Sequence, residues 1–289
     1  MTMLTQPDTV YGLAASGDHL YAARFSGLYR SLDGGHTWQE ALSSLERLEP
    51  LTITAAATDG EASIFAGTKG AVLRSTDRGS SWQIVGLASP PPNVTALALS
   101  PHYREDGLIA AATAEDGMFI STDRGANWLP WNFGLFDLHI YALAFSLNFA
   151  ADRTIFAGTE SGLFRSHNGG RAWRDVAFPL EAAPVLSLSW SAQRLFAGTE
   201  NGGLLVSDDN GVNWQPNYPT GTVNALHTSG SRGWMLLEDQ LLTSQDGGIS
   251  WQAVSSLIPA HQLAMALLVT DSGQVLVGCA DGTILSAGS

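Results

Sequence analysis

Cysteine and positive charge are both scarce in this sequence. Cys279 is the single cysteine, so no disulfide can form within the chain, and a buried thiol is its expected state. Only 14 lysine and arginine residues stand against 27 aspartate and glutamate residues, which gives a net charge of −13, and no run of basic residues is present. Such a surface repels phosphate backbones and anionic lipids. We therefore expect no nucleic-acid partner.

Long apolar segments are absent as well. No stretch approaches the roughly 18 apolar residues that a membrane-spanning helix requires. The start, MTMLTQPDTV, lacks the basic region followed by an apolar stretch that a secretory signal has. These features predict a chain that does not insert into a membrane, and we expect a cytoplasmic location.

The patterns of common metal and cofactor sites are also missing. The histidines lie at positions 19, 36, 102, 139, 167, 227 and 261, without the spacing of metal ligands. The glycine-rich stretches read as turns, because none is a phosphate-binding loop that leads into a helix. The sequence thus predicts neither a metal site nor a bound cofactor.

What the sequence does contain is an internal repeat. The pattern Ser-x-Asp-x-Gly-x-x-Trp occurs at intervals of roughly 40 residues, beginning at Ser31, Ser75, Ser121, Ser166, Ser207 and Ser244. The fourth copy, SHNGGRAW, has asparagine where the others have aspartate. The acidic or amide residue and the tryptophan of each copy are Asp33 and Trp38, Asp77 and Trp82, Asp123 and Trp128, Asn168 and Trp173, Asp209 and Trp214, and Asp246 and Trp251.

Each copy is surrounded by short apolar runs of β character. In the first unit these are VYGLAAS, HLYAAR, GLYRS and WQEAL, and they are separated by residues typical of turns. No segment between them shows helical periodicity. Four strands in about 40 residues are typical of one blade of a β-propeller.

A seventh unit without the motif closes the chain. Its runs LAMALLV, QVLVGCA and GTILSAG supply three strands, and Met1–Gln6 are well placed to supply a fourth, which would remove an exposed sheet edge. We predict an all-β, seven-bladed β-propeller with four-stranded antiparallel blades, formed by residues 1–289 as a single domain. The expected blades cover residues 8–48, 49–90, 91–136, 137–180, 181–219, 220–258, and 259–289 with 1–7.

The repeated motif resembles the Asp-box (BNR) repeat of sialidases, xyloglucan-degrading glycoside hydrolases, sortilin-type receptors and photosystem II assembly factor-like proteins. The resemblance extends over nearly the whole chain. In length and layout the chain is most similar to the single-domain, seven-bladed assembly factor-like group, and it lacks an evident arginine-rich patch. A sialidase would be expected to have six blades and an Arg-Ile-Pro-type signature, and a xyloglucan hydrolase a second propeller.

The residue types of the motif, called the box below, suit a turn. Glycine adopts positive φ at no steric cost, aspartate accepts hydrogen bonds from turn amides, and tryptophan buries a large flat surface. Because the strands of a blade alternate in direction, a box between the third and fourth strands lies on the outer part of one end of the ring. We therefore expect a structural role for all six boxes.

The turns between the second and third strands are expected at the opposite end. They carry Arg24, Lys69, Glu115, Asp116, Glu160, Glu200, Glu238 and Asp281. The segment LPWNFGLFDLHIY, residues 129–141, is expected to bring Trp131, Phe136, His139 and Tyr141 to the same end. Carboxylates beside aromatic side chains favour binding of a cation, a basic protein segment or a carbohydrate. The alternative is that these turns are merely solvated and that the aromatic residues pack onto the blades.

Two functions follow from this arrangement. The first is a non-catalytic, monomeric propeller that binds a protein segment or a glycan through its acidic, aromatic-flanked end. The second is a glycosidase- or lyase-type enzyme whose catalytic carboxylates lie among the same turns, with Glu160 and Glu200 as the candidates. A glycosidase needs two carboxylates at a defined separation, which a sequence alone does not reveal.

Overall fold

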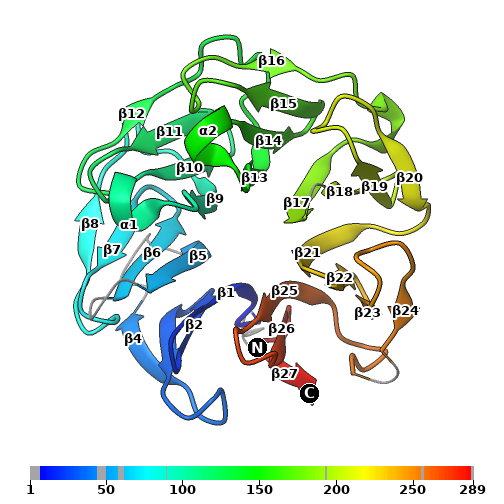
Figure 1. Ribbon diagram of the computed structural model, residues 1–289. Coiled ribbons are helices and arrows are strands. Elements are labelled where there is room, and N and C mark those ends of the chain that lie inside the picture. The colour runs from blue at the N-terminus through cyan, green and yellow to red at the C-terminus, as the bar shows by residue number, and fades with distance from the viewer. Residues whose placement is uncertain are drawn as a thin grey trace, which may run out of the picture.

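A computed structural model shows the chain as a ring of seven β-sheets around a central axis (Figure 1). The structure describes residues 7–43, 50–57, 62–88, 90–192, 194–254 and 257–287. Within these residues, six sheets have four antiparallel strands in chain order from the axis outward, and the seventh has three. The predicted all-β, seven-bladed propeller is confirmed.

The strands follow the repeat. Blades 1 and 2 contain β1 (Val10–Ser16), β2 (His19–Arg24), β3 (Gly27–Ser31), β4 (Gln39–Ser43), β5 (Pro50–Ala57), β6 (Ala62–Thr68), β7 (Val72–Ser75) and β8 (Gln83–Val85). Blades 3 and 4 contain β9 (Val94–Leu99), β10 (Ile109–Thr113), β11 (Met118–Ser121), β12 (Leu129–Pro130), β13 (Ile140–Phe145), β14 (Ile155–Thr159), β15 (Gly162–Ser166) and β16 (Arg174–Asp175).

The remaining blades continue the pattern. Blades 5 and 6 contain β17 (Val185–Ser191), β18 (Arg194–Thr199), β19 (Leu204–Ser207), β20 (Gln215–Tyr218), β21 (Val223–Ser229), β22 (Arg232–Leu237), β23 (Leu241–Ser244) and β24 (Gln252–Ala253). Blade 7 contains β25 (Ala264–Val269), β26 (Val275–Cys279) and β27 (Ile284–Ala287). The helices α1 (Tyr103–Asp106), α2 (Phe149–Asp152) and η1 (Leu180–Ala182) are single turns, and no described helix has the length or apolar content to cross a bilayer.

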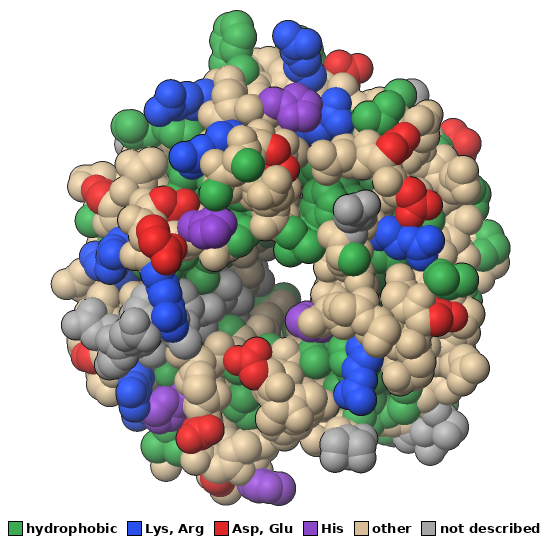
Figure 2. All heavy atoms as spheres, in the orientation of Figure 1, with side chains coloured by type: hydrophobic (Ala, Val, Ile, Leu, Met, Phe, Trp, Pro, Cys, Tyr) green, Lys and Arg blue, Asp and Glu red, His purple; other side chains and the backbone are tan. Residues whose placement is uncertain are grey.

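The two ends of the ring differ in what they carry. The boxes and the loops between first and second strands, including α1 and α2, lie at one end, which is called the box end and faces the viewer in Figure 1. The turns between second and third strands lie at the other, which is called the acidic end. An opening remains at the centre of the ring (Figure 2).

Every box forms a similar network of hydrogen bonds. In the third box the Ser121 hydroxyl donates to Asp123 Oδ1 at 2.8 Å and accepts from the amide of Gly125 at 2.8 Å. The backbone and side-chain amides of Asn127 donate to the two carboxylate oxygens of Asp123 at 2.8 and 2.7 Å. These bonds are local, so an eight-residue motif can specify the turn without help from another element.

Blades are held together by close packing of small residues. A Cβ added at Gly158 in β14 would lie 2.7 Å from Val185 Cγ1, in the first strand of the next blade. The same packing joins the last blade to the first, where a Cβ at Gly278 would lie 2.5 Å from Val10 Cγ1. The ring is therefore closed by the same contact that joins its other blades.

The chain enters the ring beside the last blade. The Thr9 hydroxyl donates to the carbonyl of Ala280, in the turn between β26 and β27, at 2.8 Å. The predicted fourth strand of that blade, Met1–Gln6, lies outside the described residues, so its pairing stays a prediction.

Candidate functional site

The strand order places the predicted acidic turns at one end of the ring. Each follows the second strand of its blade, and the exposed residues there are Lys69, Glu115, Asp116, Glu160, Glu200, Glu238 and Asp281. This end faces away from the viewer in Figures 1 and 2.

The innermost strand of each blade has a register shift near its start. In blade 4 the pairing with β14 moves from Ile140 to Ala142, and Tyr141 is the extra residue. Equivalent shifts occur in the other blades, at Tyr11 in blade 1 and Asn224 in blade 6, for example. A bulge re-aims a side chain that would otherwise follow the pleat.

Side chains from the segment that precedes β13 and from the turn that follows β14 lie close together. His139 Nδ1 lies 3.5 Å from Asp137 Oδ1 and 3.6 Å from Glu160 Oε2. The backbone joins the same segments, because the amide of Glu160 donates to the carbonyl of His139 at 3.1 Å. Asp137, His139, Tyr141, Glu160 and Glu200 are called the acidic cluster below.

Two residues of the acidic cluster have shifted pKa values. Burial raises the pKa of Tyr141, and the negative charges of Glu160, Asp137 and Glu200 raise it further. Burial acts on Asp137 in the same direction, but hydrogen bonds from Ser161 and from the amide of His139 outweigh it and hold the pKa of Asp137 below its usual range. At neutral pH the site therefore combines a neutral phenol with an ionised carboxylate.

Asp137 was not among the residues predicted from the sequence. Its Oδ2 accepts from the amide and the hydroxyl of Ser161, both at 2.7 Å, so it ties the interblade segment to the turn between β14 and β15. The sequence feature that points to Asp137 is its position two residues before His139. An aspartate can accept a hydrogen bond from the backbone amide two residues further on, and Asp137 does so from His139 at 3.0 Å.

Other predicted residues at the acidic end are held by local contacts. Arg24 lies 3.4 Å from the Asp8 carboxylate, and its guanidinium is 4.9 Å from the Tyr29 ring centre. Asp281 accepts from the side-chain amide of Gln262 at 2.8 Å and from the amide of Thr283 at 2.9 Å. These contacts are structural in character.

The aromatic segment, residues 129–141, contributes side chains to two different regions of the structure. His139 and Tyr141 reach the acidic cluster, whereas Phe136 is 86% exposed and Leu135 is buried in the core. Trp131 lies elsewhere than predicted: its ring centre is 5.4 Å from the Arg171 guanidinium in the fourth box. The reason is that the chain after β12 runs across to blade 4, where the Trp173 indole donates to the carbonyl of Trp131 at 2.8 Å.

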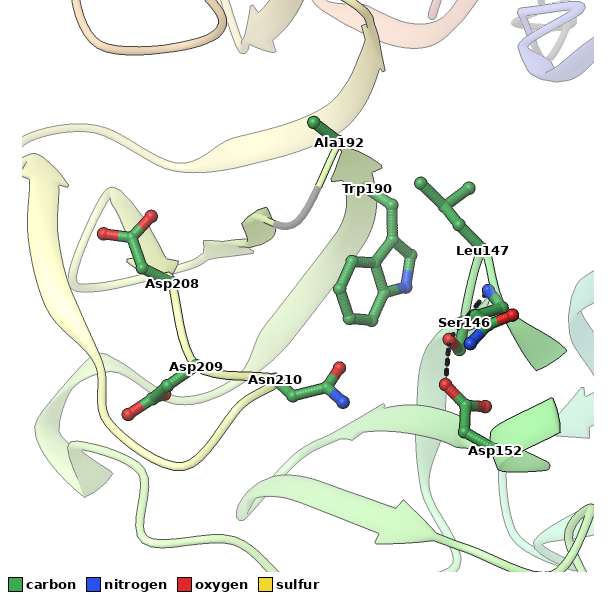
Figure 3. A pocket seen from close by; sticks show the side chains of 9 residues that line it. Ser146, Leu147, Asp152, Trp190, Ala192, Asp208, Asp209 and Asn210 are labelled. Carbon is green, nitrogen blue, oxygen red and sulfur yellow. Dashed lines mark hydrogen bonds between the residues drawn. The ribbon is translucent and has the colours of Figure 1, made fainter.

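Three surface cavities lie at the box end, between neighbouring blades. The one between blades 4 and 5 has a volume of about 350 Å³, and Figure 3 shows Trp190 between the loop of Ser146 and Leu147 and the box residues Asp209 and Asn210. Cavities of about 490 and 550 Å³ lie between blades 5 and 6 and between blades 3 and 4. The sequence did not reveal them, because their walls come from loops that only the packing of blades brings together.

The carboxylates around the cavity in Figure 3 already have partners. Asp152 accepts from the Ser146 hydroxyl at 2.6 Å, and Asp208 lies 2.8 Å from Arg194 Nε. Asp209 belongs to a box, where bonds from the Asn213 amides lower its pKa to about 2. A carboxyl held ionised in this way is a poor general acid. Within the described parts of the chain, no group of three or more His, Cys, Asp or Glu side chains is arranged to hold a metal ion.

Fold and repeat together define the chain as a seven-bladed Asp-box β-propeller. A profile of the Sortilin-Vps10 family, described as sortilin, neurotensin receptor 3, matches residues 26–132. No curated protein matches the sequence.

Solved structures similar to this chain include two of YCF48. YCF48 from Cyanidioschyzon merolae is 15% identical, with a TM-score of 0.72 over 98% of this chain and 96% of that one. YCF48 bound to a D1 peptide is 19% identical, with a TM-score of 0.75 over 100% of this chain and 96% of that one.

A GH74 xyloglucanase from Xanthomonas campestris is 18% identical, with a TM-score of 0.75 over 97% of this chain but only 52% of that one. At these identities the likeness concerns the fold, and function has to be argued from the site.

Proposed function

We propose that the chain is a non-catalytic binding propeller that takes up a basic protein segment at its acidic end. The observation that carries the proposal is the acidic cluster, where Asp137 and Glu160 both lie within 3.6 Å of His139 and their charges act on Tyr141. A lysine or arginine side chain could pair with these carboxylates and lie against the phenol ring. The structure of a similar propeller, YCF48, with a bound D1 peptide supports peptide binding as a use of this fold.

A role in assembling a larger complex would use the same surface. A propeller that holds an extended segment of a client protein keeps it in place without chemistry, and the opposite end stays accessible to a second protein. The net charge of −13 would speed the approach of a basic segment and slow that of an acidic one.

The test is direct binding of fluorescent peptides to the full chain, measured by anisotropy. A lysine- and arginine-containing peptide should bind, with an affinity that falls as salt rises, and a glutamate-containing peptide of equal length should not. Glu160→Gln and Glu200→Gln should each weaken binding roughly three- to tenfold. Glu238→Gln removes a carboxylate at the same end but outside the acidic cluster, so it is the matched control.

Equal losses from all three substitutions would indicate only long-range attraction and would contradict a defined site. Binding of a glycan instead of the peptide would move the ligand class to carbohydrate. Release of sugar from a glycan, abolished by Glu160→Gln or Glu200→Gln, would replace the proposal with a glycosidase.

A further inference from the structure

The cavity between blades 3 and 4 differs in charge from the rest of the molecule. It has a volume of about 550 Å³, and its walls include Trp131, Arg153, His167, Asn168 and Arg171. Figure 2 shows basic side chains gathered on this part of the box end, around the region of α2. In a chain with 27 acidic and 14 basic residues, such a local excess of arginine is unexpected.

Arg153 occupies a backbone conformation that favours glycine. It follows α2 with φ of 52°, in the left-handed region. The equivalent residue after α1 in blade 3 is Gly107, with φ of 61°. The Arg153 carbonyl accepts from the amide of Gly169 at 2.8 Å, and the Gly107 carbonyl accepts from the amide of Arg124 at 3.0 Å. Each carbonyl is thus bonded to the box of its own blade. An arginine where the neighbouring blade has glycine carries a conformational cost, and such strain often marks a functional position.

The fourth box lacks the negative charge of the other five, because Asn168 stands in place of the aspartate. Asn168 Oδ1 still accepts from the amide of Ala172 at 2.9 Å, as the aspartates of the other boxes do from their counterparts. In those five boxes the second carboxylate oxygen accepts from a polar side chain four residues on, supplied by Thr37, Ser81, Asn127, Asn213 or Ser250. Here that residue is Ala172, so the side-chain amide of Asn168 keeps donors available for a ligand.

The two arginines of the cavity form no ion pair with any described residue. The Arg153 guanidinium lies 5.4 Å from the Phe149 ring centre, and that of Arg171 lies 5.4 Å from the Trp131 ring centre. The carboxylate on the facing wall, Asp106, accepts from the Ser100 hydroxyl at 2.7 Å and from the amide of Leu108 at 2.9 Å. Its oxygens are thus engaged within their own loop.

We propose that this cavity binds a small organic oxyanion, a carboxylate or a phosphate, independently of the acidic end. Arg153 and Arg171 supply charged donors for its oxygens, and the amide of Asn168 adds neutral ones. The indole of Trp131 offers a flat apolar wall for the rest of the ligand. The volume lies within the range of small-molecule sites.

The test is calorimetric titration of the full chain with inorganic phosphate, phenyl phosphate and benzoate at low ionic strength. One-to-one binding of either aromatic anion is expected, more tightly than inorganic phosphate because of Trp131. The preferred aromatic anion then distinguishes a phosphate ligand from a carboxylate ligand.

Three variants locate the site. Arg153→Gly, Arg171→Gln and the double change Asn168→Asp with Ala172→Ser should each weaken binding by about tenfold or more. Arg153→Gly should not lower the melting temperature, because glycine suits the left-handed conformation. Arg174→Gln removes an exposed charge of the same blade outside the cavity and should leave affinity unchanged.

Two results would overturn the proposal. One is that none of the three anions binds with a dissociation constant below about 10 mM, a free energy too small for a specific site. The other is that Arg174→Gln weakens binding as much as the cavity variants do, which would reduce the effect to general attraction.

Discussion

At the scale of single residues, the box carboxylates act on the turn that contains them. The Asn127 side chain donates to Asp123 and, with the other bonds of the box, lowers the pKa of that carboxyl to about 2. Hydrogen bonds from Ser81 have the same effect on Asp77, whose pKa is also about 2. Such groups are ionised at any physiological pH and cannot deliver a proton in a reaction.

The pH dependence of stability should report these carboxylates. Their pKa values are lower in the folded chain than the usual aspartate value of 3.8, so their contribution to stability is complete above about pH 4 and is lost as pH falls toward 2. We expect the melting temperature to fall over that interval. Asp123→Asn should lower it at pH 7, because two amide groups would then face each other, and the gap to the wild type should shrink by pH 2. A gap that stays constant would contradict this account.

At the scale of elements, the box hairpin also forms part of the contact between blades. The box glycine lies over an aromatic residue in the second strand of the preceding blade: a Cβ added at Gly125 would be 2.5 Å from Phe65. Arginine side chains add a second connection, since Arg165 in β15 donates to the carbonyl of Asn210 in the next box at 2.9 Å. The motif therefore positions neighbouring sheets as well as its own strands.

Substitution of a box glycine should reveal this second role. Gly125 has φ of 80° and contacts Phe65, whereas Gly273 has φ of 85° and no atom within 4 Å of an added Cβ. Gly273→Ala should cost about 1 kcal/mol from backbone strain alone. Gly125→Ala should cost about 2–4 kcal/mol, because the clash adds to the strain. Chemical denaturation of both variants measures the difference, and equal losses would argue against packing between blades at this point.

Prediction of these elements from the sequence was accurate where the signal was local. Blades 1 to 6 are recognised from a box and the apolar runs around it, and blade 7 from its apolar runs alone, because these signals lie within a few residues of each other. The path of residues 131–136 was not recognised, because Trp131 is placed by Trp173 and Arg171, some 40 residues further along the chain.

At the scale of the whole molecule, ring closure and the separation of charge are the main features. Blade 7 packs on blade 1 through Val10, Leu20 and Leu276, which belong to one buried cluster. The Gln274 side chain also donates to the carbonyl of Gly34 at 2.8 Å. One end of the ring carries the acidic cluster, and the other carries the cavity of Arg153 and Arg171.

Removal of residues 1–7 tests the closure. If Met1–Gln6 complete blade 7, their loss exposes the edge of β27, and the melting temperature should fall by many degrees. Scanning calorimetry of the truncated chain is the measurement. An unchanged melting temperature would exclude closure by this segment.

The number of blades, their strands and the chemistry of their turns follow from the sequence, since all of these depend on residues close together along the chain. It also indicated which turns share an end, because strands in a blade alternate in direction. Only the folded structure shows that Glu160 lies beside His139 and Asp137, that Trp131 faces Arg171, and that Arg153 and Asn168 line one cavity. The physical reason is that these neighbours come from different blades or loops, so their distances are set by the packing between sheets and by the path of the connecting chain.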